Sequence, residues 1–393
     1  MANFLKKGAF LLIAILAPLV IANEILRFTY IKNYYLSKYF VYNSEFIYSL
    51  KKNFHEKLPF CPFNPKKYGK NPYWELKINS QGIRADETIQ QKSPSTIRII
   101  CIGDSVTFGH EVDAPHSYPF LLKKILQKFY GQSLRVEVIN AGISGYTSRQ
   151  GLVYLKKSLL QFQPDWVILE FGPNDVKPNI QHFFLKDKQI LQGNVKTGFK
   201  KISQSPLVYT VMLISRQPLL LSIYNLTGFF IFPVIDKYFL KPLRIQTSPT
   251  SKNIRWSYTR VPPADFLDNY LQFIWLAEHY QFKLLIYLPY GIFPYYRSLL
   301  LNLAYEHKIP VVDFSEGFSQ YQMKQLENNP NYTEMLSFYI NDLGKDFLTK
   351  KPQYLFTTDE YHPNGLGNQL IAEKMANVIM SYSPVLQVKN SIK

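Results

Sequence analysis

The pattern of apolar and polar positions from residue 96 onward alternates between two kinds of segment. Short runs rich in β-branched and other apolar residues predict strands at 96–103, 135–140, 165–172, 283–289 and 310–314. Segments with apolar residues three and four positions apart predict helices at 118–130, 148–162, 263–280, 295–307 and from about 365 to 382. This alternation predicts an α/β fold with a parallel sheet covered by helices on both faces.

Two regions do not follow this rhythm. Residues 31–92 are rich in Tyr, Phe, Lys and Asn, and the stretch "FCPFNPKKYGKNPYW" predicts irregular structure, so we interpret the region as a stalk or linker. Residues 178–260 contain the uncharged run "PLLLSIYNLTGFFIFPVI" and are interpreted as a cap-like insertion. The predicted organisation is a membrane segment at 1–30, the stalk at 31–92, and a catalytic domain at 93–385 that contains the insertion.

The first 30 residues have the character of a targeting segment. Lys6 and Lys7 precede "GAFLLIAILAPLVIA", which is typical of a signal peptide or a signal anchor. Val20 and Ala22 would permit cleavage after Ala22, whereas "ILRFTY" extends the apolar character enough for a short transmembrane helix. We favour the uncleaved anchor, with the bulk of the chain on the extracytoplasmic side, periplasmic or at the cell surface.

Composition and charge narrow the partners and cofactors. The 393 residues are 47% hydrophobic, enough for a sizeable core, and the net charge of +17 suits an anionic membrane surface or an acidic polymer. No zinc-finger, RNP or helix-turn-helix pattern occurs, so nucleic acid is not an expected partner. The seven histidines lack metal-ligand spacing, and of the two cysteines Cys101 is expected to be a buried free thiol, although a bridge from Cys61 stays open.

The candidate chemistry lies where predicted strands end. Ser105 follows the first strand in "GDS", where the plainer interpretation is a turn with Asp104 or Ser105 capping the next helix. "AGISGYTS" and "GPND" follow the next two strands and offer backbone N–H groups at Gly145 and a side-chain amide at Asn174. Near the C-terminus, "DEYHP" places Asp359 three residues before His362, close enough to orient its imidazole.

Together the blocks "GDS", "NAGISG", "GPND" and "DEYHP" resemble those of the SGNH hydrolases, also called the GDSL esterase and lipase family. The resemblance implies Ser105 as nucleophile, His362 as base and Asp359 as its orienter. It also implies an oxyanion hole formed by the Ser105 N–H, the Gly145 N–H and the Asn174 amide, and a flavodoxin-like three-layer α/β/α fold that needs no cofactor or metal. His110 and His116 are weaker candidates for the base, because no carboxylate is spaced from them as Asp359 is from His362.

The expected function is that of a membrane-anchored serine ester hydrolase outside the cytoplasm, acting on a lipid or an acylated glycan. The alternatives are O-acyl transfer or deacetylation on a cell-surface polysaccharide and, from another class, a noncatalytic membrane scaffold. A groove with exposed Trp and Tyr would favour the glycan, and a deep apolar tunnel would favour lipid esters. Since Asn174 precedes the insertion and His362 follows it, a single membrane span there would separate the catalytic groups, so we expect a cap or an interfacial element.

Overall fold

The computed structural model describes residues 38–43, 45–60, 66, 69–177, 259–321, 329–350, 355–359 and 361–382. The chain divides into two compact units, one made of residues 1–41 and 193–255 and the other of residues 42–192 and 256–393. The fold and the site described below belong to the second unit.

The centre of this unit is a five-stranded sheet in which all neighbouring strands are parallel. Its strands are β5 (Thr96–Gly103), β6 (Arg135–Asn140), β7 (Trp166–Glu170), β8 (Lys283–Leu288) and β9 (Val311–Asp313), in the order β6-β5-β7-β8-β9. Counted along the chain this is the flavodoxin-like order 2-1-3-4-5. The predicted α/β fold with a parallel sheet is therefore confirmed.

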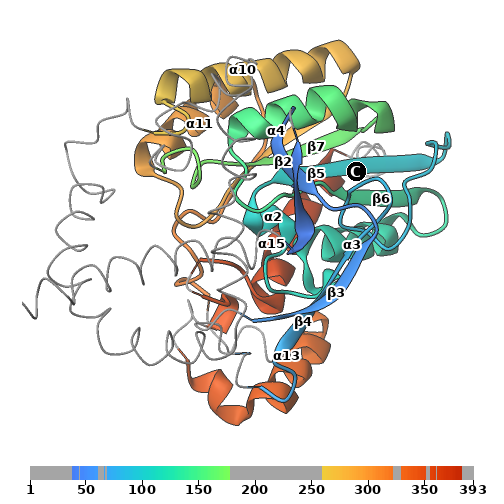
Figure 1. Ribbon diagram of the computed structural model, residues 1–393, viewed down its shortest axis with the longest axis vertical. Coiled ribbons are helices and arrows are strands. Elements are labelled where there is room, and N and C mark those ends of the chain that lie inside the picture. Colours follow the sequence, from blue (N-terminus) through green and yellow to red (C-terminus); the bar gives the residue numbers. More distant parts are fainter. Residues whose placement is uncertain are drawn as a thin grey trace, which may run out of the picture. The chain divides into compact units, whose positions relative to one another are not determined.

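Helices cover both faces of the sheet (Figure 1). On one face lie α4 (Ser148–Tyr154), α10 (Pro263–Tyr280) and α11 (Pro294–Glu306), and on the other α3 (Tyr118–Tyr130) and α15 (Gly365–Ser381). After α4 the predicted helix at 148–162 continues as a π-helical turn at Leu155–Leu159 and a 3₁₀ turn at Leu160–Phe162. The sequence analysis missed α13 (Pro330–Leu343), which contributes Tyr332, Met335, Leu336 and Tyr339 to the core on the α3 and α15 side.

The central strands are buried on both faces, which explains why they read as nearly continuous apolar runs. Ile99 and Cys101 of β5 share one buried cluster with Leu122 of α3 and Ile371 of α15. Cys101 is a free buried thiol. Ile100 and Ile102, which point to the opposite face because side chains alternate along a strand, have no exposed surface either.

The N-terminal region is more ordered than the irregular structure that its composition predicts. It holds β1 (Phe40–Asn43), β2 (Ile47–Leu50), β3 (Phe54–Pro59) and β4 (Tyr73–Ile78), and β3 pairs with β4 in an antiparallel ladder. In β4 the residues Trp74, Leu76 and Ile78 are buried while their neighbours are more exposed, a period of two that fits a strand with one face on the core. Residues 38–92 thus carry strands, and the division into stalk and catalytic domain stays a prediction.

Two further predictions concern residues outside the described ranges. The anchor at 1–30 and nearly all of the insertion at 178–260 are not described. Among the helices that are described, none combines the length and the apolar character needed to cross a bilayer.

Candidate active site

The nucleophile candidate lies at the carboxyl end of β5. Gly103 ends the strand, and Ser105 opens the four-residue helix α2 (Ser105–Phe108). The Asp104 carboxylate accepts a hydrogen bond from the Val106 N–H at 2.9 Å, so the capping role considered for Asp104 is real. The strand and this cap together fix the position of Ser105 at the switch point between β5 and β7, where ligands bind in doubly wound folds.

His362 and Asp359 are held in one tight turn before α15. The Thr358 N–H donates to the His362 carbonyl at 2.7 Å, and an isolated bridge joins Thr357 to Pro363. The Asp359 carboxylate accepts backbone N–H groups from Tyr361 at 3.2 Å and His362 at 2.9 Å. These bonds set the carboxylate directly beside the imidazole.

The three predicted catalytic side chains form one hydrogen-bonded row. His362 Nδ1 lies 2.7 Å from Asp359 Oδ2, and His362 Nε2 lies 2.8 Å from Ser105 Oγ. Because Nδ1 faces a carboxylate it carries the ring proton, which leaves Nε2 to accept the hydrogen bond from the Ser105 hydroxyl. The geometry suits a histidine that takes a proton from a serine as the serine attacks.

The electrostatics of the row favour this exchange. Burial alone would lower the pKa of His362, but the hydrogen bond and the charge of Asp359 outweigh it and raise the pKa. Burial would likewise raise the pKa of Asp359, yet the hydrogen bond from His362 and the imidazole's charge hold it well below its ordinary value. The carboxylate therefore stays ionised and stabilises an imidazolium at His362.

Asn174 lies beyond the carboxyl end of β7, and its amide is held at both ends. Its Nδ2 donates to Asp104 Oδ2 at 2.6 Å, and its Oδ1 accepts from Lys177 Nζ at 2.5 Å. These two bonds fix which end of the amide is the donor, and one Nδ2–H remains for another acceptor. Because Asp104 directly precedes Ser105, Asn174 is tied to the nucleophile turn.

Gly145 lies in the loop that follows β6. Its φ of 83° belongs to the left-handed region, which a side chain would strain. Arg260 Nη1 donates to the Gly145 carbonyl at 2.8 Å, and the Tyr48 hydroxyl donates to the Ser144 carbonyl at 3.0 Å. The loop is thus anchored on both sides of the predicted oxyanion donor, and the part of the Gly145 N–H in catalysis stays a prediction.

Comparison with known proteins finds similarity over the segment that carries Ser105, Gly145 and Asn174. The model of the GDSL-like Lipase/Acylhydrolase family matches residues 101–215, which include Ser105, Gly145 and Asn174 and end before Asp359. Thioesterase 1/protease 1/lysophospholipase L1 of Escherichia coli K12 is 33% identical over 145 residues, 37% of this chain and 64% of that protein. These matches support membership of the GDSL, or SGNH, hydrolase family.

Other proteins to which this chain is similar are named for different esters. Acetylxylan esterase of Xylanibacter ruminicola is 32% identical over 117 residues, 28% of this chain and 23% of that protein. A solved structure of the acetyl xylan esterase AlAXEase covers 72% of this chain and all of that one, at 18% identity and a TM-score of 0.39. The matched segments span less than two thirds of these two curated relatives.

A second histidine lies against His362, the predicted base. The ring of His110 is centred 5.0 Å from that of His362, at an interplanar angle of 54°. Burial, and then the charge of His362, lower the pKa of His110 to about 3, so this ring is neutral near pH 7. Neither His110 nor His116 replaces His362 in the bond to Ser105, in agreement with the low weight that their sequence context gives them.

The sequence analysis missed the residues that support the predicted groups. Asp104 and Lys177 bind Asn174, and Arg260, at the far end of the insertion, binds the Gly145 loop. Asp175, next to Asn174, accepts hydrogen bonds from the backbone and the hydroxyl of Ser148 and so ties this loop to the start of α4. The four residues are ordinary polar residues in loops, and only the fold shows what they contact.

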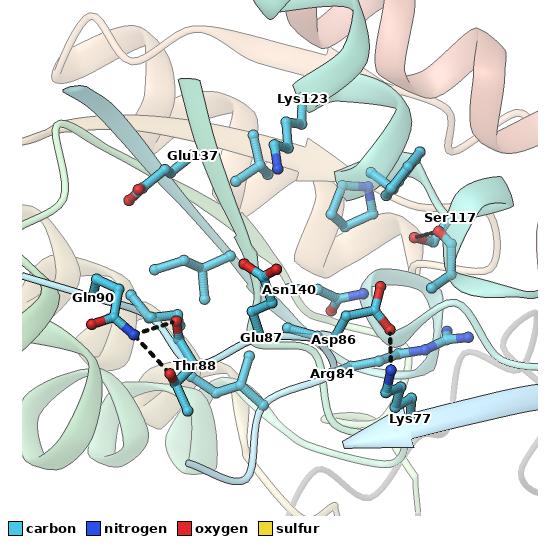
Figure 2. A pocket seen from close by; sticks show the side chains of 18 of the residues that line it. Lys77, Arg84, Asp86, Glu87, Thr88, Gln90, Ser117, Lys123, Glu137 and Asn140 are labelled. Atoms are coloured by element: carbon cyan, nitrogen blue, oxygen red, sulfur yellow. Dashed lines mark hydrogen bonds and ion pairs between the residues drawn. The ribbon is translucent and has the colours of Figure 1, made fainter. Parts of the chain in front are cut away.

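One sizeable pocket lies away from this row of catalytic side chains. It has a volume of about 350 Å³ and is lined by residues of β4, the following loop, α3 and β6. Figure 2 shows an ion pair there between Lys77 and Asp86. The pocket contains none of the predicted catalytic residues, so we do not assign the reaction to it.

Proposed function

We propose that this protein is a serine ester hydrolase that works through an acyl-enzyme at Ser105. The observation that carries the proposal is the row Ser105, His362 and Asp359, with bonds of 2.8 and 2.7 Å. The family model and the relatives named as esterases support a hydrolase acting on ester bonds.

The reaction follows from the atoms that these residues present. Ser105 Oγ attacks the ester carbonyl while His362 Nε2 takes the hydroxyl proton, and the negative charge moves to the carbonyl oxygen. The Ser105 and Gly145 N–H groups and the free Nδ2–H of Asn174 stabilise that oxyanion. His362 then returns the proton to the departing alcohol. Water, deprotonated by the same imidazole, attacks the acyl-enzyme and releases the acid.

The proposal is tested with a chain-length series of p-nitrophenyl esters. We expect a rapid release of about one equivalent of p-nitrophenol per protein molecule with the esters whose deacylation is slow, because an acyl-enzyme accumulates. The acyl length with the highest kcat/KM would then define the acid part of the substrate. If no ester in the series is cleaved faster than in buffer, the ester-hydrolase assignment is wrong.

The second candidate is an acylated glycan as substrate, with hydrolysis or transfer of its acyl group. Two observations favour it. Tyr361, next to His362, has 57% of its surface exposed, and its ring is centred 5.9 Å from that of Tyr290 in the loop after β8. Exposed aromatic faces offer an apolar surface with polar edges, which suits a sugar ring, and one relative is named an acetylxylan esterase.

We expect Tyr361→Ala to lower kcat/KM for acetylated xylan oligosaccharides about fivefold, through KM, because about 1 kcal/mol of ring contact is lost. The same variant should cleave p-nitrophenyl acetate like the wild type, since that ester has no sugar. Tyr305→Ala is the matched control, because Tyr305 on α11 is 88% exposed. A KM for the oligosaccharides that does not change in Tyr361→Ala would argue against the glycan.

Asn174→Ala should lower kcat about 10²- to 10³-fold with little change in KM, as expected when one oxyanion donor is lost. The measurement is steady-state hydrolysis of the best p-nitrophenyl ester. Asn302→Ala serves as the matched control, because Asn302 is an exposed amide on α11 outside the bonds that hold the Asn174 loop. An equal effect on KM, or no effect on kcat, would mean that Asn174 only supports the loop.

The location that we propose is the extracytoplasmic side of a membrane, with the domain anchored by residues 1–30. Its support is the pair Lys6 and Lys7 followed by an uncharged apolar stretch. Protease added to intact spheroplasts should remove the domain while a cytoplasmic marker survives. Protection of the domain until the cells are lysed would contradict this location.

A further inference from the structure

Glu170 is a buried acidic residue next to the nucleophile turn. It is the last residue of β7 and has no exposed surface. Its Oε2 accepts three hydrogen bonds from the turn that holds Ser105: from the Asp104 N–H at 3.0 Å, the Thr107 N–H at 3.3 Å and the Thr107 hydroxyl at 3.0 Å. The backbone on both sides of Ser105 is therefore bound to one carboxyl oxygen.

Glycine at position 103 makes this approach possible. A Cβ there would lie 2.5 Å from Glu170 Oε2 and 2.2 Å from Thr107 Oγ1, which is closer than side chains tolerate. The Gly of "GDS" thus leaves space for the carboxyl group of the neighbouring strand. This links Glu170 to the sequence block that contains the nucleophile.

The other oxygen of Glu170 differs from Oε2. Oε1 is buried and accepts a hydrogen bond from no donor in the described part of the chain. Asp104 follows directly on Gly103, its backbone N–H bonds Glu170 Oε2, and its carboxyl group acts on that of Glu170. A buried carboxylate with an unpartnered oxygen and a second carboxyl group beside it is unfavourable, and a proton on Oε1 removes both the desolvation cost and the repulsion.

The contacts of Asp104 decide which group holds the proton. Its Oδ1 accepts from the Val106 N–H at 2.9 Å and its Oδ2 from Asn174 Nδ2 at 2.6 Å, so both oxygens act as acceptors. Both oxygens of Asp104 therefore have donors, whereas Glu170 Oε1 has none among the described residues, so the place for a proton is Glu170 Oε1. Burial first, and then the charge of Asp104, raise the pKa of Glu170 well above its ordinary value.

The other titratable groups that act on Glu170 do not oppose this assignment. Within the described residues they are three buried phenols on three different elements: Tyr118 on α3, Tyr270 on α10 and Tyr287 on β8. Burial raises the pKa of each phenol well above its ordinary value, so each is neutral near pH 7. Asp104 is therefore the charged group that Glu170 meets at close range.

We propose that Glu170 is a neutral carboxylic acid protonated at Oε1, and that the hydrogen bonds of its Oε2 hold the backbone of Asp104 and Thr107, and with it the Asn174 amide and the Ser105 turn, in catalytic register. Glu170 is a positioning residue, because it acts through Asp104 and does not touch the substrate. The catalytic part of the inference rests on the proposed ester hydrolysis, whereas the protonation of Glu170 does not.

Infrared spectroscopy of the whole protein at neutral pH tests the protonation. A neutral carboxylic acid has a C=O stretch that is separate from the bands of carboxylates. We expect this band in the wild type and in Ser105→Ala, and its loss in Glu170→Gln. Glu278→Gln, at an exposed position on α10, is the matched control and should keep the band. A wild-type spectrum without the band would overturn the proposal.

Kinetics test the positioning. Glu170→Gln keeps a neutral side chain with an acceptor oxygen for the turn, so it should retain most of the wild-type kcat. Glu170→Ala removes the acceptor and should lower kcat about 10²-fold with KM little changed, because a displaced donor costs rate more than binding. Equal losses in the two variants would overturn the proposal. If neither variant folds, alkaline titration of Ser105→Ala decides the protonation. The C=O band should disappear as the pH rises and the acid loses its proton. A band that persists unchanged until the protein unfolds would contradict a titrating acid beside Asp104.

The two proposals fail in different ways. Failure of the proposed function would show as no ester cleavage by the wild type, or as full activity in Ser105→Ala, with the infrared band still present. Failure of the Glu170 inference would show as an inactive Ser105→Ala variant and a wild-type protein without the band.

Discussion

Replacing Ser105 with alanine is expected to lower kcat for ester hydrolysis by at least about 10⁴-fold, which leaves only catalysis by binding and by the oxyanion donors. The reason is the position of Oγ, 2.8 Å from His362 Nε2 at the carboxyl end of β5. Alanine removes the atom that attacks the substrate while the Asp104 cap and the bonds of Glu170 to the turn remain. The protein should therefore stay folded, with the thermal midpoint of the wild type.

The matched control is Ser298→Ala, because Ser298 is an exposed serine on α11 whose hydroxyl donates only to the Pro294 carbonyl. It should leave kcat unchanged. If Ser105→Ala keeps more than about a tenth of the wild-type kcat, another group performs the attack, and the noncatalytic scaffold or a different site becomes the better account of the fold.

The second large effect is expected for His362→Ala, which should lower kcat by about 10⁴- to 10⁶-fold. Without the imidazole of His362, no base takes the Ser105 proton. The neighbouring ring of His110 has a pKa lowered to about 3, and in the described part of the chain Ser105 Oγ bonds His362 and not His110. The double variant Ser105→Ala/His362→Ala should be no slower than the single ones, since the two residues act as a unit.

His279→Ala is the control for the loss of a histidine, because His279 is exposed on α10 and stacks on Trp275 far along the chain from the catalytic turn. If the fold-loss in kcat of the double variant equalled the product of the two single losses, Ser105 and His362 would act independently. That result would contradict a shared proton between Oγ and Nε2.

Much of the α/β domain could be predicted, because the parallel strands are buried on both faces and their apolar runs stand out. The predicted ranges 96–103, 135–140, 118–130 and 263–280 agree with β5, β6, α3 and α10. The missed helix α13 carries its core residues Tyr332, Met335, Leu336 and Tyr339 at helical spacing, so the signal was present in the sequence. The N-terminal strands are short, and a region rich in Tyr, Lys and Asn hides their alternation.

The candidate site could be predicted in part. Ser105, Gly145, Asn174, Asp359 and His362 stand in recognisable blocks at strand ends, and the structure brings Ser105, Asp359 and His362 into one row. Glu170 could not be found this way, because a glutamate at the end of a strand is ordinarily exposed. Its burial and its contact with Asp104 depend on the pairing of β7 with β5, which is a property of the fold.

The central claim, that Ser105 is the nucleophile activated by His362, is tested most directly by labelling with a fluorophosphonate and locating the adduct by peptide mass spectrometry. The account predicts one adduct per molecule, on Ser105, absent in Ser105→Ala and formed far more slowly in His362→Ala. An intact protein that takes up no label, or that takes it up on another residue at the same rate in both variants, would contradict it.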